Sequence, residues 1–132
     1  MIKEVAATDY YRIRVDTEKN RIYFEVMGQV SDPTHVENLV RDMEAAIKLT
    51  ADGFTCLSDL SQLKILVVRD AVEGVVGTLA AAGVRKVAAV WGPRILPKFE
   101  VRKAAKQAES TGYTRQRKDF ESFGQAEAWL DE

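Results

Sequence analysis

Hydrophobic and polar positions alternate along two short segments near the start of the chain. Residues 11–15 alternate between apolar and charged side chains, the pattern of a strand with one buried face. The same pattern returns over Ile22–Met27, and Gly28 is expected to end it. The connection, Thr17–Arg21, is polar and contains Asn20, a residue suited to turns. So short a connection predicts an antiparallel hairpin.

A helical period follows this hairpin. Asp32 can cap a helix and Pro33 suits its first position, while Asp52–Gly53 is expected to stop it. The helix has an acid four residues before a base at two places, which stabilises exposed helical turns. Its apolar stripe consists of Val36, Leu39, Val40, Met43 and Ile47.

The middle of the chain predicts two strands and one helix. Phe54–Leu60 carries apolar side chains on both faces, as a central strand does, and Lys86–Trp91 is a nearly continuous apolar run. Between them Ala71–Ala82 has helical spacing. The segment Leu63–Val68 has the composition of a strand, but it lies just before Asp70, a capping residue, and we interpret it as a buried loop.

The last part of the chain predicts a helix, an edge strand and a second helix. Pro97 can open a helix that runs to about Thr111, and Arg115–Glu121 has the pattern of a weak edge strand. Ser122 and Gln125 form a capping box for the final helix, whose buried side is Ala126, Trp129 and Leu130. The order ββαβαβαβα predicts an α/β fold: a mostly parallel five-stranded sheet with an N-terminal antiparallel hairpin and packed helices.

Composition narrows the class of protein. A chain of 132 residues that is 46% hydrophobic fits a single domain over residues 1–132. Its 19 basic and 20 acidic residues give a nearly balanced net charge, whereas nucleic-acid-binding domains are usually strongly basic. No apolar run approaches the ~20 residues that span a bilayer, and residues 1–9 do not form a secretory signal. The single cysteine fits a reducing compartment, so a cytoplasmic protein is expected.

Several short stretches, spread over nearly the whole chain, carry a resemblance to a known family. They are Met27–Gly28, Gly53–Phe54, Ser58–Ser61, Val84–Ala88, Arg117–Phe120 and Glu127–Leu130. On these residues the chain resembles the SpoIIAA-like proteins, which share the STAS fold with anti-sigma-factor antagonists. The resemblance implies that fold. It also implies either a partner-switching regulator or a domain that holds a lipid or another apolar ligand.

The chain departs from the partner-switching members at one position. Those members carry a phosphorylated serine at the start of the second long helix, whereas residues 62–77 of this chain contain no hydroxyl side chain. Asp70 stands roughly at that place. It is either an ordinary helix cap or a fixed negative charge in place of phosphoserine, and a helix N-terminus favours both.

Residue types that support catalysis are sparse. Cys56, in a predicted strand, is expected to be a small core residue, and His35, in the first turn of a predicted helix, a surface residue. They are the only cysteine and histidine and fall on different elements, so they predict neither a metal site nor a nucleophilic pair. Neither the dinucleotide nor the phosphate-loop glycine motif is present. Asp59 follows a central strand as the phosphorylated aspartate of receiver domains does, but residues 28–31 lack the acidic pair such domains need. We therefore expect no catalytic residues, metal or cofactor.

Charge is uneven along the chain. Residues 94–118 contain eight basic and two acidic residues, and the remainder has 11 basic and 18 acidic ones. Lys98, Arg102 and Lys106 are four apart and share a helix face. That face is either simply solvated or binds an anion or an acidic partner.

Two functions follow, and an enzyme ranks behind both. The first is a non-catalytic regulatory or protein-interaction module. The second is a carrier of a small apolar or lipid-like ligand at the C-terminal ends of the strands, lined by Asp59, Ser61, Trp91 and Arg94. Helix Ala71–Ala82 is small or apolar nearly all round, so either a second chain or the segment Leu63–Val68 is expected to cover it. The first case predicts a homodimer.

Overall fold

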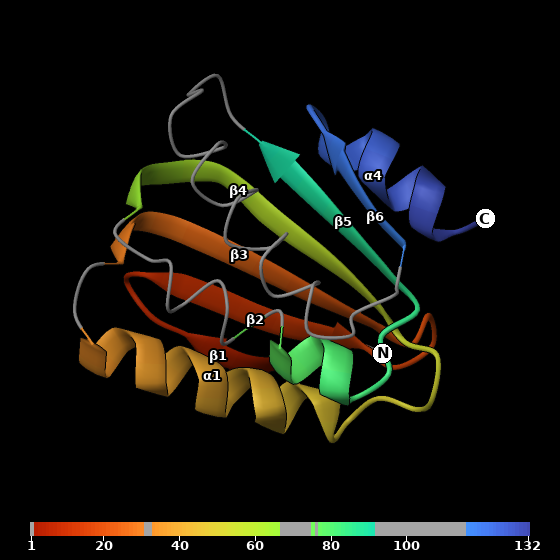
Figure 1. Ribbon diagram of the computed structural model, residues 1–132, viewed down its shortest axis with the longest axis horizontal. Helices are drawn as coiled ribbons and strands as arrows, with labels where there is room; N and C mark the ends of the chain where they lie inside the picture. The colour runs from red at the N-terminus through yellow and green to blue at the C-terminus, as the bar shows by residue number, and fades with distance from the viewer. Residues whose placement is uncertain (1, 31–32, 67–74, 76, 92–115) are drawn as a thin grey trace.

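The computed structural model describes residues 2–30, 33–66, 75, 77–91 and 116–132, which build one six-stranded sheet in the order β1-β2-β3-β4-β5-β6 (Figure 1). The first three strands pair antiparallel and the last four pair parallel. The elements are β1 (Ile2–Ala7), β2 (Tyr11–Asp16), β3 (Arg21–Val30), α1 (Pro33–Ile47), β4 (Thr55–Leu66), β5 (Lys86–Trp91), β6 (Gln116–Phe120) and α4 (Phe123–Leu130).

The predicted α/β class, the N-terminal hairpin and the mostly parallel pairing are confirmed, but the expectation of five strands is wrong. The sixth strand is β1, which pairs antiparallel with β2 at the edge of the sheet. Its sequence does not alternate, because Val5 and Ala6 both pack against the core where the register shifts. Edge strands commonly carry charges and bulges, and these features hide the period on which the sequence prediction relied.

Two predicted boundaries are also wrong. Gly28 does not end β3, which continues to Val30 by pairing with β4 from Gly28↔Leu63 to Val30↔Leu66. The same pairing makes residues 63–66 a strand instead of the predicted buried loop. Residues 63–66 form a strand because the end of β3 supplies hydrogen-bond partners for their backbone. The sequence of residues 63–66 does not identify this partner strand.

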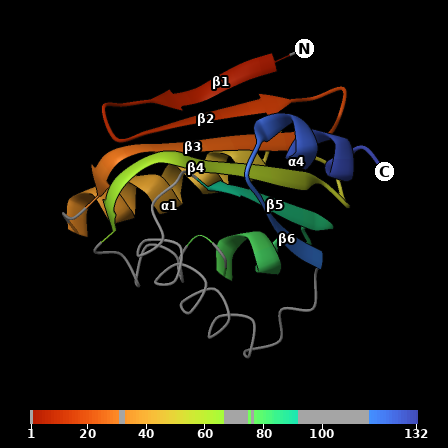
Figure 2. The ribbon, with the colours of Figure 1, turned by 90° about the horizontal axis from the view of Figure 1, so that it is seen from above.

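The two faces of the sheet are covered by different helices (Figures 1 and 2). On one face α1 lies against β1, β2 and β3, and helical residues 75 and 77–81 add Val75 and Leu79 to the same core. On the other face α4 lies against β4, β5 and β6. β4 supplies side chains to both cores, Cys56 to the first and Leu57 to the second, as predicted for a central strand.

Local signals predicted the ends of several elements correctly. Asn20 takes a positive φ angle of 55° in the expected turn, and Gly83 takes one of 82° just after helical residues 77–81. Gly53 has a φ of 76° in the turn before β4, but the expectation that it stops the helix is wrong, because α1 already ends at Ile47. Ser122 caps α4 by accepting a hydrogen bond from the Gln125 backbone N–H at 3.2 Å. β6 is an edge strand, as expected. The helix predicted from Pro97 to Thr111 lies outside the described residues, and within the described part no helix is long and apolar enough to cross a membrane.

Candidate functional site

The described residues with buried polar side chains form one row across the start of the parallel strands. They are Arg21, Thr55 and Lys86, and they open β3, β4 and β5. Strand register places Arg21 beside Thr55 and Thr55 beside Lys86. The side chains of this row point toward α4. Side chains alternate between the two faces of a strand, and the next residues along β3 and β4, Ile22 and Cys56, belong to the core on the opposite face.

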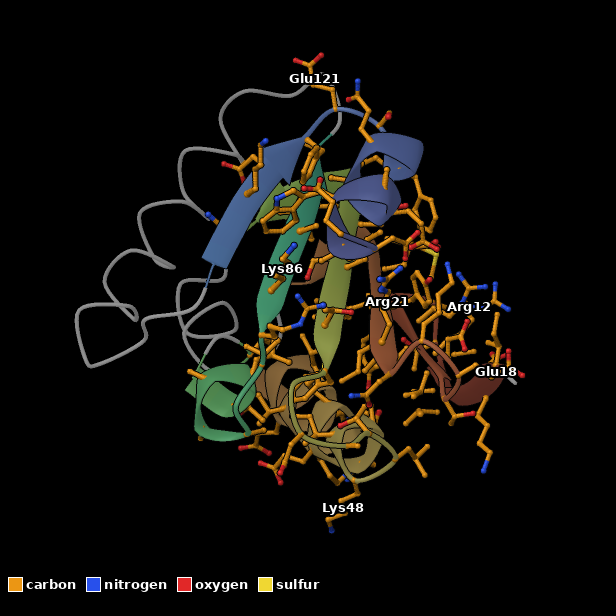
Figure 3. The ribbon with its side chains drawn as sticks, turned by 90° about the vertical axis from the view of Figure 1, so that its right-hand side faces the viewer. Arg12, Glu18, Arg21, Lys48, Lys86 and Glu121 are labelled. Carbon is orange, nitrogen blue, oxygen red and sulfur yellow. The ribbon has the colours of Figure 1, made fainter. Side chains whose placement is uncertain are left out.

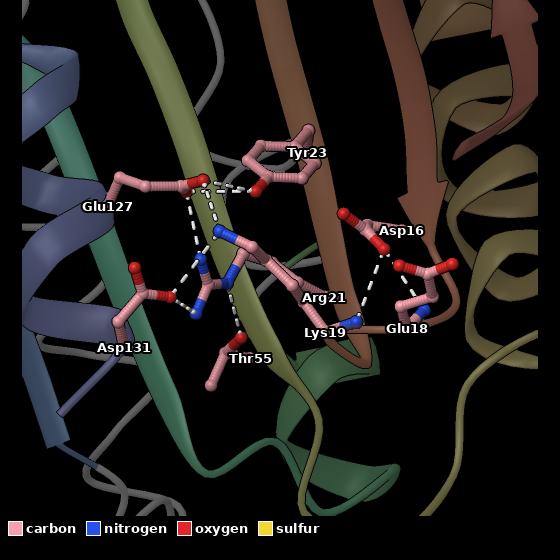
Figure 4. A network of polar contacts seen from close by, with 8 residues as sticks. All are labelled: Asp16, Glu18, Lys19, Arg21, Tyr23, Thr55, Glu127 and Asp131. Atoms are coloured by element: carbon pink, nitrogen blue, oxygen red, sulfur yellow. Dashed lines mark hydrogen bonds and ion pairs between the residues drawn. The ribbon is translucent and has the colours of Figure 1, made fainter. Parts of the chain in front are cut away.

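Arg21 is 3% exposed, and its guanidinium has a partner on each of its three nitrogens (Figure 4). Nε donates to the Thr55 hydroxyl at 2.9 Å, and Nη1 donates to Glu127 Oε2 at 2.9 Å. Nη2 lies 2.9 Å from Asp131 Oδ1. Glu127 and Asp131 are four residues apart on α4 and at its C-cap, so both carboxylates reach the same arginine.

Glu127 connects this arginine to the hairpin between β2 and β3. The Tyr23 hydroxyl donates to the Glu127 carboxylate at 2.7 and 2.9 Å, and Lys19 Nζ lies 3.1 Å from it. Burial favours the neutral acid, but the hydrogen bonds and positive charges of these neighbours outweigh it and lower the pKa of Glu127. We call Lys19, Arg21, Tyr23, Thr55, Glu127 and Asp131 the polar clasp.

Lys86 also contacts the C-terminal end of α4 (Figure 3). Its ammonium donates to the Trp129 carbonyl oxygen at 3.1 Å and lies 4.8 Å from the centre of the Trp129 ring. The same ring contacts Phe120, with centroids 5.7 Å apart. A cation near the last carbonyls of a helix is favourable, and so is a cation over an aromatic face.

The hydrogen bonds and positive charges of the clasp favour the ionised form of its two carboxylates. A general acid at neutral pH needs a raised carboxyl pKa, whereas the pKa of Glu127 and that of Asp131 are both lowered. Burial and the bond to Glu127 raise the pKa of Tyr23, which keeps that hydroxyl a donor. The clasp also lies at the N-terminal ends of the parallel strands, whereas open α/β sheets bind ligands at the C-terminal ends.

Comparison with solved structures agrees with this sheet order and helix placement. The chain aligns with the crystal structure of an uncharacterized DUF3478-family protein from Shewanella loihica PV-4, described as having a SpoIIAA-like fold. The alignment has a TM-score of 0.63 and 16% identity, and covers 95% of this chain and 97% of that one. The chain has the SpoIIAA-like fold. No protein-family model and no curated protein matches its sequence.

Cys56 of this SpoIIAA-like domain is a core residue, as its position in a strand predicted. It is fully buried, and burial raises the pKa of its thiol to about 12. The Ser58 hydroxyl lies 3.8 Å from its sulfur. A thiol with this pKa is not a nucleophile near neutral pH.

The structure brings together only part of the predicted ligand site. Asp59 Oδ1 accepts hydrogen bonds from the Ser61 backbone N–H at 3.0 Å and from the Ser61 hydroxyl at 2.6 Å. Trp91 packs with Leu60 on the other face of the sheet, and its indole N–H donates to Asp119 at 2.9 Å. Asp59 alternates with Leu60 along β4, so Asp59 and Trp91 point to opposite faces. Arg94 lies outside the described residues.

Four other predicted positions also lie outside the described residues. They are the switch-equivalent Asp70 and the patch Lys98, Arg102 and Lys106. His35 falls in the first turn of α1, as expected.

Sequence analysis missed the polar clasp because it assigned Arg21 to a solvated turn. Lys19 and Arg21 alternate at the entry to β3, and Glu127 and Asp131 share one helix face. The available signal was that two basic residues on one side of a strand could pair with two acidic residues on one face of a helix. It was weak, because 106 positions separate Arg21 from Glu127.

Proposed function

We propose that this SpoIIAA-like domain is a non-catalytic regulatory or protein-interaction module. One observation carries the proposal: among the described residues, the most extensive network of ionisable side chains holds α4 on the sheet, and the pKa values of its two carboxylates are lowered, which does not suit a general acid. A fold neighbour of uncharacterized function adds the fold and nothing about activity.

The alternative, a carrier of a small apolar ligand, draws less support. It placed Asp59, Ser61 and Trp91 in one lining, but Trp91 faces the other side of the sheet. The strand order is also sequential, so the parallel strands have no point at which their order reverses. Ligand sites of open α/β sheets favour such a switch point.

The partner surface we propose is the basic helix face that the spacing of Lys98, Arg102 and Lys106 predicts, which would receive an acidic protein surface. Native mass spectrometry of the chain purified from its source organism tests the proposal. We expect a complex of defined stoichiometry that is lost when all three residues are changed to Glu. The matched control changes three exposed bases elsewhere, Lys3, Lys48 and Arg85, to Glu.

Retention of the complex in the control and its loss in the patch variant would support the proposal. A chain that carries a small apolar molecule and no protein would favour the carrier. Equal loss in both variants would mean that net charge, and not this face, decides binding.

A further inference from the structure

The helix α4 is short, and its apolar contact with the sheet is small. It is eight residues long, its buried residues are Ala126 and Leu130, and Trp129 is partly buried beside Phe120. Isolated helices shorter than about 12–15 residues are marginal in water, so α4 is helical because it is docked. Burying one leucine side chain supplies only a small part of the stability of a typical domain.

The polar clasp adds charged contacts to this attachment, and two of its side chains, Lys19 and Asp131, are largely exposed. Lys19 pairs with Glu127 at 3.1 Å and with Asp131 at 3.6 Å, and the Lys19 and Asp131 side chains are 42% and 49% exposed. Ion pairs this exposed are weakened by salt, because mobile ions screen them.

Detaching α4 does not leave the Arg21 guanidinium buried without a charged partner. Two of its three partners are Glu127 and Asp131, which belong to α4 and its C-cap. When α4 leaves, these partners leave together and water can reach the guanidinium. Opening therefore avoids the penalty of an unpaired buried charge, which makes the removal of a single partner costly.

We propose that α4 is a salt-gated latch, which opens from the sheet as a unit while α1 and the strands stay folded. Opening uncovers the side chains beneath it, which are Tyr23, Leu57, Ala88 and Val90. Proteins commonly open in such units at free energies below that of global unfolding. This device does not depend on the function proposed above.

Hydrogen exchange of the whole chain at 50 mM and 500 mM NaCl tests the latch. Backbone amides 126–131 are expected to exchange at least tenfold faster than amides 55–59 of β4 at either salt concentration. Higher salt should accelerate exchange in α4 severalfold and leave α1 unchanged. Equal protection of α4 and β4, or no response of α4 to salt, would overturn the proposal.

Substitutions separate the clasp from general destabilisation. Glu127→Gln removes one charged partner of Arg21 and should accelerate exchange in α4 about tenfold, with a much smaller change in α1. Glu44→Gln, on the exposed side of α1, is the matched control and should change neither region. Equal acceleration of α1, β4 and α4 by Glu127→Gln would mean that the helix opens only when the whole domain unfolds.

The two tryptophans provide a second readout, since Trp129 lies on α4 and Trp91 is buried with Ala89 and Leu60 on the opposite face of the sheet. Trp91→Phe leaves Trp129 as the sole tryptophan, and Trp129→Phe leaves Trp91. Circular dichroism first establishes that both variants fold. The Trp129 fluorescence should then change at a lower urea concentration than the Trp91 fluorescence, and the gap should widen with salt. Coincident transitions at both salt concentrations would contradict a separate latch.

Discussion

The two helices that cover the sheet are attached by different kinds of contact. The helix α1 buries Leu39, Met43 and Ala46, and its side-chain hydrogen bond to the sheet in the described contacts joins Asp42 to the Tyr11 hydroxyl. The helix α4 is about half as long; it buries Ala126 and Leu130 and is also held by the polar clasp and Lys86. Apolar attachment depends on area removed from water, whereas charged attachment depends on pairing, salt and pH. The attachment of α1 to the sheet is therefore expected to be insensitive to salt, whereas the attachment of α4 should depend on salt and pH.

The largest expected effect is on the apolar side. Met43 is fully buried against the sheet, so Met43→Ala should destabilise the domain by about 3 kcal/mol through lost burial and a cavity. Urea denaturation at low and high NaCl measures it, and the loss should be the same at both. A loss that shrinks in high salt would mean that α1 also depends on charge.

Truncation of Trp129 should have a smaller effect. Its ring is half-buried and contacts Phe120 and Lys86, so Trp129→Ala should cost about 2 kcal/mol, below the 3–5 kcal/mol typical of a fully buried aromatic residue. The midpoint of thermal unfolding reports this. A midpoint as low as that of Met43→Ala would mean that apolar contacts hold α4 as strongly as they hold α1.

Loss of the Glu127 charge should cost about 1–2 kcal/mol. The substitution Glu127→Gln keeps the shape of the side chain but leaves Arg21 with one charged partner, Asp131. Urea denaturation at neutral pH measures the cost, with Glu44→Gln as the control that should have almost no effect. An unchanged urea midpoint in Glu127→Gln would show that the clasp does not stabilise the folded domain.

Acid should remove the same contribution without mutation. The pKa values of Glu127 and Asp131 are lowered on folding from ordinary values of 4.5 and 3.8, so their contribution is fully present above the ordinary values. It is lost as pH falls through the lower values of the folded state. The urea midpoint should therefore decline below about pH 4.5 more steeply in the wild type than in Glu127→Gln. Parallel curves would assign the acid sensitivity to other carboxylates.

The smallest effect on stability is expected on the exposed side of residues 77–81. Leu79 is buried there, but Gly77 and Ala81 are exposed, so Ala81→Glu should change the free energy of unfolding by less than about 0.5 kcal/mol. If this side is the predicted homodimer contact, the substitution should dissociate the dimer without unfolding it. Sedimentation velocity at micromolar concentration measures the change, and a wild-type monomer would reject the homodimer.

Much of the fold was predictable because it depends on local patterns. Alternation predicted β2 and the start of β3, helical spacing predicted α1, and Asn20 forms the expected turn. The continuous apolar run predicted β5 as a strand covered on both faces. In each case the residues that decide the structure are neighbours in the chain.

Other features were decided by distant parts of the chain. β1 and residues 63–66 of β4 are strands because β2 and β3 offer them backbone partners, and their own side chains show no clear period. The separation of Asp59 from Trp91 follows from the register between β4 and β5.

The sequence by itself determined the α/β class, the positions of most helices and strands and the buried state of Cys56, because periodicity and composition act over a few residues. Only the tertiary structure decided that Arg21 is buried and that α4 is attached by charge. A charged residue at the end of a strand is solvated or paired according to what packs over it. The partner carboxylates lie more than a hundred positions away, so only the folded sheet brings them to that arginine.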